Sequence, residues 1–470
     1  MEDENLRNIF RAAVLALVVA QLVGFIVAFD LRPLIFVAAM VLLVSGLPYM
    51  NGSFRNATTI FLGLGALLLM ASRQPLSSWI AAASSLSNIV SIVAVMQLFS
   101  LPIRLGGYDH SIRSWVEGRF SSRSALFIFT TLVVHLLTSF LNLGSIPLSV
   151  SLFGEPLRKK LPNYERFMAA AATRGYVLSA LWSPGAVNLY LVVQATGLPW
   201  SRVFLPGLIL ALVGMALSVL IELPGAGLLG RRGGGQDLRS TEARPGAFAS
   251  GATTEGVLPA WHVLVVVILF VVATFLLDAF SIGAPGSRIV ATGILISSLW
   301  SLLFIRKKGF RSEVGGLWSE GLFKVADIGP FFVAMGLFSG SLESSGTLAS
   351  IAPLLEGVSK ALGGASVVIA GFLIVAGSLV GLHPFITIVL FGKMLSQAGL
   401  PLPTLTLALG LAAGGVAAYM VSPFAGVIMT LARLLGAKAS DVALRWNWRF
   451  TAVFFAVGMI FAFIWGRDCG

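Results

Sequence analysis

The sequence has few charged residues and a single cysteine. Of its 470 residues only 11% are charged, while 57% are hydrophobic. About 25% of the residues of a soluble globular chain are charged, so a soluble fold of this size would lack the charge to cover its surface, whereas a surface in lipid needs no such cover. Because Cys469 is the only cysteine, an intrachain disulfide and a multi-cysteine metal site are excluded.

Several sequence motifs of membrane-bound catalysts are also missing. The chain has no Gly-x-x-x-x-Gly-Lys-Ser/Thr loop, which argues against a pump driven by ATP. It has no His-Glu-x-x-His motif either, which argues against a common zinc intramembrane protease. We therefore expect neither an enzyme nor a bound cofactor, apart from Na⁺ as a candidate coupling ion.

Long apolar runs dominate what is present. Residues 12–29, 203–221 and 258–277 are examples that approach or reach the roughly 20 residues needed to cross a bilayer. Backbone polar groups in lipid must be satisfied internally, which leaves only helices and closed barrels. Continuous apolar runs, rather than short alternating strands, favour helices. The sequence therefore predicts an all-α polytopic membrane protein.

The net charge of +12 comes from short basic clusters that lie between apolar spans. Lys and Arg accumulate in cytoplasmic loops, so the clusters indicate membrane topology and not nucleic-acid binding. We expect the inner (plasma) membrane of a bacterium or archaeon, with the N-terminus in the cytoplasm and the C-terminus outside. Placing every cluster inside requires residues 124–154 to enter and leave the membrane on the same side.

This topology predicts about eleven transmembrane helices and two re-entrant helical hairpins, at about 124–154 and 364–397. Two further segments, at about 164–196 and 403–434, are expected to be broken helices. Ordinary proline-kinked helices are the alternative at each of these places. The predicted organisation comprises an extra N-terminal helix (1–32), a first repeat (33–222), a cytoplasmic linker (223–257) and a second repeat (258–470).

The repeats are indicated by five short motifs that recur in order after 237 to 239 residues. Ser183-Pro184, for example, recurs as Ser422-Pro423. Opposite orientation of the two copies follows from the charge clusters. Inverted repeats with broken helices are typical of secondary transporters, whose binding sites lie near the middle of the membrane.

The candidate site lies at the four predicted breaks, where half-helix ends expose unpaired N–H and C=O groups. Helix N-termini attract anions, and helix C-termini attract cations. The candidate substrate-binding residues are Asn142, Gly144, Ser145, Ser183, Pro184, Asn188, His383, Pro384, Thr387, Ser422 and Pro423. The candidate cation-coupling residues are Asn142, Ser145, Ser183, Gly381, Ser422 and Asp327.

The side-chain chemistry of these candidates suits small ions. Asn142, Ser145 and Asn188 offer neutral oxygens to a hard cation and hydrogen-bond donors to a carboxylate. His383 would pair with an anion or relay a proton, and Asp327 is an intramembrane carboxylate suited to ion coupling. The alternatives are a packed core histidine, and Ser and Thr hydroxyls that bond back to their own helices.

Two of these segments resemble the ion transporter superfamily, which includes divalent-anion/sodium symporters, citrate carriers and arsenite permease-like proteins. Residues 136–148 look like its asparagine-bearing hairpin tip, and residues 175–190 look like its discontinuous helix. The chain departs from the dicarboxylate branch because Asn142 is followed by Leu143 and Gly144, not by a Ser-Asn-Thr triplet. The resemblance implies a homodimer and an elevator-like movement.

The predicted function is secondary active transport of a small organic anion, with a carboxylate as the favoured class, coupled to Na⁺ or H⁺. The expected partners are that anion, the cation, the lipid bilayer and a second copy of the chain. One alternative is a cation/proton antiporter on the same scaffold. Another is the membrane subunit of a transporter that depends on a binding protein.

Overall fold

The computed structural model describes residues 2–27, 29–108, 122–222, 261–347, 363–397 and 402–468, together with the single positions 120, 350, 353, 357 and 361. Within these ranges the chain is helical and contains no strand. Ten helical segments of the described residues are long and apolar enough to cross a membrane. The prediction of an all-α polytopic membrane protein is confirmed, whereas the predicted linker (223–257) lies outside the described residues.

The helices of the first part of the chain are α1 (Glu2–Ile26), α2 (Arg32–Gly46), α3 (Gly52–Ala71), α4 (Leu76–Ser84), α5 (Ser87–Met96), α6 (Ser100–Gly106), α8 (Arg123–Leu141), α9 (Ser145–Lys160), α10 (Tyr164–Ser179), α11 (Val187–Thr196) and α12 (Trp200–Glu222). Those of the second part are α13 (Trp261–Ala279), α14 (Pro285–Leu302), α15 (Phe310–Gly316), α16 (Gly329–Ser344), α18 (Ser366–Leu379), α19 (Pro384–Gln397), α20 (Thr404–Val421), α21 (Gly426–Leu435) and α22 (Trp446–Asp468).

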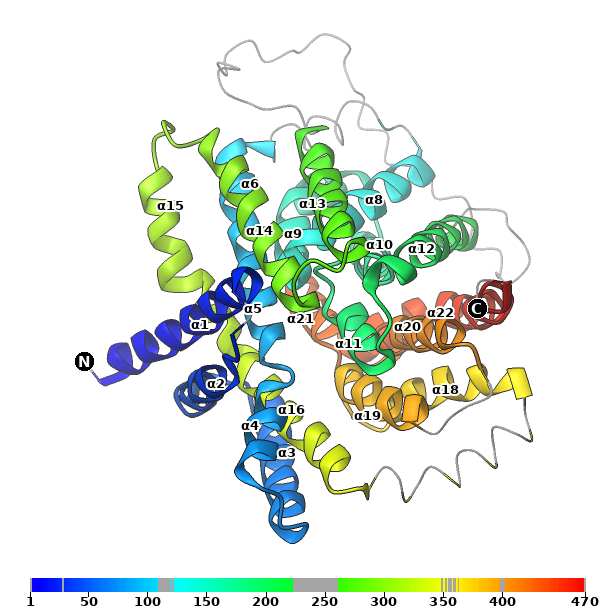
Figure 1. The fold of residues 1–470 in the computed structure, drawn as a ribbon. Helices are drawn as coiled ribbons and strands as arrows, with labels where there is room; N and C mark the ends of the chain where they lie inside the picture. Colours follow the sequence, from blue (N-terminus) through cyan, green and yellow to red (C-terminus); the bar gives the residue numbers. More distant parts are fainter. Residues whose placement is uncertain are drawn as a thin grey trace.

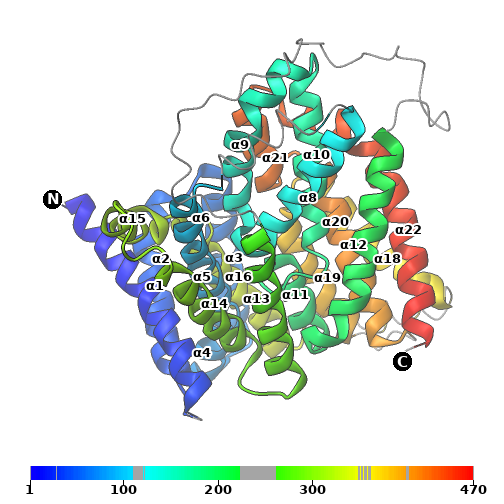
Figure 2. The same ribbon diagram turned by 90° about the horizontal axis from the view of Figure 1, so that it is seen from above.

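The helices form two groups that lie side by side (Figures 1 and 2). The scaffold group contains α1 to α5, α14 and α16, which pack against one another. The hairpin group contains α8 to α11 and α18 to α21, and α12 and α22 pack against it. Each group therefore combines helices from both parts of the chain.

Both predicted hairpins contain two helices joined by a tight turn. In the first, α8 ends at Asn142, which has a φ of 52°, and a 3₁₀ turn over Asn142–Gly144 leads into α9. In the second, the turn between α18 and α19 contains Gly381, with a φ of 105°. Pro147 lies in the first turn of α9 rather than at the tip. The re-entrant path of both hairpins remains a prediction.

The two broken helices are interrupted where Ser-Pro occurs in the sequence. The first is broken between α10 and α11 at residues 180–186, and the second between α20 and α21 at residues 422–425. Each resumed half ends at a glycine in the left-handed conformation, Gly197 and Gly436, which are 239 residues apart. The breaks therefore recur at the spacing of the sequence motifs, while the opposite orientation of the two copies remains a prediction.

Glycines allow the closest helix contacts in the hairpin group. A Cβ atom on Gly175 of α10 would lie 2.6 Å from the Thr131 carbonyl oxygen of α8. A Cβ atom on Gly414 of α20 would lie 2.6 Å from the Cα of Gly371 in α18. Small residues at such crossings let backbones approach closely, as is common between membrane helices.

A buried arginine ties three helices together beside the hairpin group. The Arg174 guanidinium of α10 donates to Glu222 Oε1 of α12 at 2.9 Å and to Asn447 Oδ1 of α22 at 3.1 Å. It also lies over the Phe450 ring, 4.8 Å from the ring centroid. Because the partners of Arg174 lie on α12 and α22, this charge holds the helix bundle together.

Candidate functional site

A small cavity lies where the first hairpin, the second hairpin and both broken helices meet. About 20 Å³ is open to the centre of a water molecule, which is room for about one water. The lining residues are Thr138, Asn142, Tyr176, Val177, Ser179, Ala180, Ala186, Val187, Asn188, Phe385, Val416 and Tyr419. Two of the predicted site residues, Asn142 and Asn188, therefore share one cavity.

Asn142 connects the first hairpin tip to the first broken helix. Its Oδ1 accepts a hydrogen bond from the Tyr176 hydroxyl at 3.0 Å, and its Nδ2 donates to the Gly185 carbonyl at 3.3 Å. A positive φ is uncommon for a residue other than glycine, although asparagine adopts it more readily than most. The amide of Asn142 is thus held in place by one partner on α10 and one within the break.

Ser145 stabilises the turn of the first hairpin through two hydrogen-bond contacts. Its hydroxyl lies 2.8 Å from the Thr138 hydroxyl, across the turn, and donates to the Asn142 carbonyl at 2.7 Å. Ser145 is fully buried and does not line the cavity, whereas Thr138 does. Gly144, at the end of the turn, is exposed. The predicted residues of this tip are thus brought together, but only Asn142 faces the cavity.

Asn188 and Tyr419 bring unpaired polar atoms to the cavity. Asn188, in the first turn of α11, is only 3% exposed, and neither Oδ1 nor Nδ2 has a hydrogen-bond partner among the described residues. The Tyr419 hydroxyl of α20 likewise has none there. Leaving a buried polar group unpaired costs about 1–3 kcal/mol. Such groups in a cavity indicate a ligand or an ordered water.

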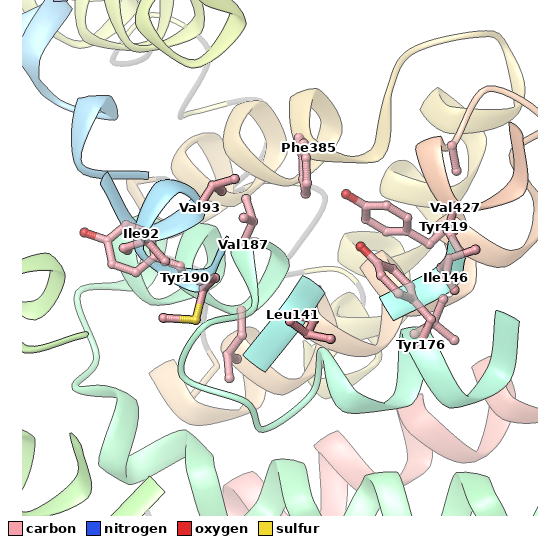
Figure 3. Close-up of a cluster of buried hydrophobic side chains, with 14 of the residues drawn as sticks. Ile92, Val93, Leu141, Ile146, Tyr176, Val187, Tyr190, Phe385, Tyr419 and Val427 are labelled. Atoms are coloured by element: carbon pink, nitrogen blue, oxygen red, sulfur yellow. The ribbon is translucent and has the colours of Figure 1, made fainter. Parts of the chain in front are cut away.

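The two tyrosines of the cavity come from different halves of the site. Tyr176 belongs to α10 and Tyr419 to α20. Figure 3 shows their rings close together, with both hydroxyls pointing toward the space bounded by Phe385 and Val187. The cavity is therefore lined by aromatic side chains from both broken helices and from the second hairpin.

Ser183 and Ser422 brace the two breaks rather than line the cavity. The Ser183 hydroxyl donates to the Ser139 carbonyl of the first hairpin. The Ser422 hydroxyl donates to the Ser378 carbonyl of the second hairpin at 3.1 Å. The two donor serines are 239 residues apart in the sequence, and so are the two acceptor serines. Each break is thereby joined to the neighbouring hairpin by the same interaction.

The two prolines that follow these serines differ in their surroundings. Pro184 lines a second small cavity, which also contains the buried ion pair between Asp278 and Arg288. Pro423 lies in the second break, before the exposed Phe424. Neither proline lines the central cavity.

His383 lies behind the cavity, in an aromatic cluster. Its ring centroid is 5.0 Å from that of Phe54 in the scaffold group, 4.7 Å from Phe385 and 5.8 Å from Tyr419. Its Nδ1 accepts a hydrogen bond from the Phe385 backbone N–H at 3.2 Å. The residue therefore packs between the two groups of helices and touches two residues that line the cavity.

The remaining candidates do not line the cavity. Pro384 begins α19, and the Thr387 hydroxyl lies 3.3 Å from that of Ser378, inside the second hairpin. Gly381 forms the second tip, with Phe424 nearby. Asp327 is exposed, at the end of a 3₁₀ turn over Phe323–Asp327. The second tip thus supplies Phe385 to the cavity but none of its predicted polar side chains.

Sequence reasoning missed the two tyrosines as site residues. The chain has only six tyrosines, and Tyr176 and Tyr419 each lie within a long apolar segment just before a predicted break. A buried tyrosine hydroxyl usually finds a partner. The small number of tyrosines and the position of these two before the breaks could therefore have indicated site residues. The orientation of Tyr419 toward the first half of the site had no signal in the sequence.

The fold is similar to that of a solved membrane transporter. The YdaH transporter of Alcanivorax borkumensis, which was described as having an unusual topology, matches 87% of this chain with a TM-score of 0.58 and 14% sequence identity. The match includes 99% of that protein's chain. No family model matches the sequence, and no curated protein matches it significantly. The chain thus has the fold of a polytopic membrane transporter.

Proposed function

We propose that this chain is a secondary active transporter that moves a small organic anion across the inner membrane, coupled to Na⁺ or H⁺. A carboxylate is the favoured class of substrate. The observation that carries the proposal is the central cavity, in which the buried amide of Asn188 has no partner among the described residues. Interrupted helices that meet around a polar cavity are typical of secondary transporters, and the fold of YdaH supports the proposal.

Asn142 and the helix ends near it are the proposed ion-binding elements. The Asn142 oxygen, the Thr138 hydroxyl and the carbonyls at the end of α8 offer neutral ligands to a small cation. The N-terminus of α11, which carries Asn188, offers N–H groups to an anion. Coupling follows if both ions occupy this cavity in the same transport step.

Movement of the hairpin group against the scaffold group is the proposed route of access, because the closed cavity has room for about one water. Among the residues that the structure describes, few polar contacts join the two groups. Lys393 of α19 pairs with Glu343 of α16 at 3.0 Å, and Asn88 of α5 donates to the Tyr190 hydroxyl of α11. Glu343 is 56% exposed, and such pairs contribute little stability. An elevator-like movement in a homodimer would break these contacts and rearrange the apolar packing between the groups.

Uptake into proteoliposomes by an Asn142→Ala variant tests the proposal. Labelled mono-, di- and tricarboxylates are offered under an imposed Na⁺ or pH gradient. Wild-type protein should accumulate at least one of them. Asn142→Ala should lose more than about 90% of that uptake, because losing about 1.4 kcal/mol of binding free energy already lowers affinity tenfold. Asn56→Ala, at an exposed position of α3, is the matched control.

Three results would contradict the proposal. Unchanged uptake by Asn142→Ala, with the variant folded, would remove the tip from the site. Proton movement driven by Na⁺ with no organic solute present would favour the cation/proton antiporter. A wild-type chain that transports only after a separate binding protein is added would favour the partner-dependent subunit.

A further inference from the structure

The side chains that line the central cavity carry no formal charge. Among the lining residues the structure describes there is no Lys, Arg, His, Asp or Glu. Arg174, two residues before Tyr176, is bonded to Glu222 and Asn447 on the other side of α10. His383 contacts the rings of Phe385 and Tyr419 but does not line the cavity. A ligand in this cavity thus meets hydroxyls, amides and aromatic rings.

We infer that the cavity, once it opens beyond its room for about one water, takes the head group of its substrate in uncharged form, through paired hydrogen bonds to Asn188 and Tyr419. The inference rests on the proposed function and narrows it. The substrate class is a carboxylic acid in its protonated form, or a primary amide of the same shape. For an acid, the coupled ion is then the proton that the acid itself carries.

The unpaired atoms of Asn188 select this class of head group. A carboxamide presents an acceptor and a donor side by side. A carboxylate presents two acceptors, so one of its oxygens would face Asn188 Oδ1 without a proton between them. A carboxylic acid or a primary amide presents one donor and one acceptor, and it satisfies both atoms at once. This holds whichever way the Asn188 amide is turned.

Tyr419 and the space beside Asn188 complete the arrangement. The Tyr419 hydroxyl, unpaired among the described residues, adds a further donor or acceptor. A Cβ atom on Gly415, one turn before Tyr419, would lie 2.7 Å from Asn188 Oδ1. The absence of a side chain at position 415 therefore leaves the Asn188 amide its room in the cavity.

The energy of burial also favours an uncharged head group. An isolated carboxylate in an apolar environment costs far more than a neutral polar group, and in practice it takes up a proton instead. Here the carboxylate oxygen binds H⁺ on the side where H⁺ is abundant, forming an O–H bond. That bond breaks on the other side, releasing the carboxylate and one H⁺ for each carboxyl group. The step transfers no net charge.

Thermal unfolding of the full chain in lipid nanodiscs tests the inference with acetamide and acetate as probes. At about pH 5 a substantial part of the acetic acid is protonated, and at about pH 8 almost none is. Acetamide should raise the Tm of wild-type protein at both pH values, by about 2 °C or more at saturation. Acetate should raise it only at about pH 5.

The variants separate binding in the cavity from general solvent effects. Asn188→Val and Tyr419→Phe should both lose the response to acetamide, and the second removes only a hydroxyl. The Tyr49 hydroxyl donates to Asp3 at the surface, so the control variant Tyr49→Phe should respond like wild type. Equal protection by acetate at both pH values, an unaltered response of Asn188→Val, or no response of wild type to acetamide would each overturn the inference.

The inference and the proposed function fail separately. Uptake that requires Na⁺ at about pH 8, together with protection by acetate at that pH, would leave the proposed function standing and remove the inference. Protection by acetamide that depends on Asn188, in a protein that transports none of the acids, would leave the recognition site and remove transport.

Discussion

The two halves of the chain, residues 32–222 and 261–468, agree in how they are braced and differ in which polar groups they supply. Ser183 and Ser422 make the same bond to a neighbouring hairpin. In contrast, Asn188 corresponds to Val427, which is also in the first turn of its helix and fully buried. The comparison teaches that packing is preserved in both halves, while the polar chemistry is concentrated in the first.

The hairpin tips show the same difference. Asn142 and Gly381 are 239 residues apart, and both have a positive φ. Glycine adopts this conformation without steric cost, whereas other residues are strained by it. A non-glycine residue at the first tip is therefore best explained by its side chain, which bonds to Tyr176 and Gly185. The second tip has the turn without the amide.

The largest expected effect concerns Arg174, whose counterpart 239 residues later is Ala413. Arg174→Met should lower the free energy of unfolding by about 3 kcal/mol, because Glu222, whose side chain is 15% exposed, loses its buried partner and keeps the exposed Arg166 at 4.0 Å. Chemical denaturation in detergent measures the change. Replacing both residues, in Arg174→Met with Glu222→Leu, should recover much of the loss.

Arg306, which is exposed, provides the control for the loss of an arginine charge. Arg306→Met should change the free energy of unfolding by no more than about 0.5 kcal/mol. If Arg174→Met changes the free energy of unfolding as little, the first half does not depend on this charge. The difference between Arg174 and Ala413 would then have no consequence for stability.

The next effect tests whether the helix crossings of the two halves are equivalent. Gly175→Ala and Gly414→Ala should each lower the free energy of unfolding by about 1–3 kcal/mol, because the added methyl group meets backbone atoms. Thermal unfolding of the two variants, side by side, measures the losses. Gly63→Ala, which has open space around its Cβ position, should show no such loss. A clear inequality between the first two would show that the crossings differ.

A gain of stability is expected where the polar chemistry is removed. Asn188→Val should raise the free energy of unfolding of the ligand-free protein by about 1–3 kcal/mol, because an unpaired buried amide disappears. The reciprocal Val427→Asn should lower it by a similar amount. Chemical denaturation without ligand measures both. A loss of stability in Asn188→Val would mean that the amide is already satisfied, and the contrast with Val427 would then be only one of shape.

Much of the helical layout could be predicted because its causes are local. Apolar runs of sufficient length specify membrane helices, and proline removes a backbone donor and so interrupts them. The breaks at Ser183-Pro184 and Ser422-Pro423 and the turn at Asn142 therefore follow from short stretches of sequence. Their bounds in the structure agree with the predicted segments to within a few residues, except that the first hairpin continues to Lys160.

The choice of side chains that face the cavity was decided by tertiary structure. A membrane helix that is apolar on every face, such as α20, gives no periodic signal of which side is inward. Tyr419 and Phe385 line the cavity and His383 does not, and this depends on how α20 and α19 rotate against their neighbours. The sequence by itself determined which helices are long and apolar enough to cross a membrane, and where the helices break. Which of the polar side chains near the breaks share the cavity was decided only by packing between distant segments, because it depends on how the helices rotate and how closely they approach.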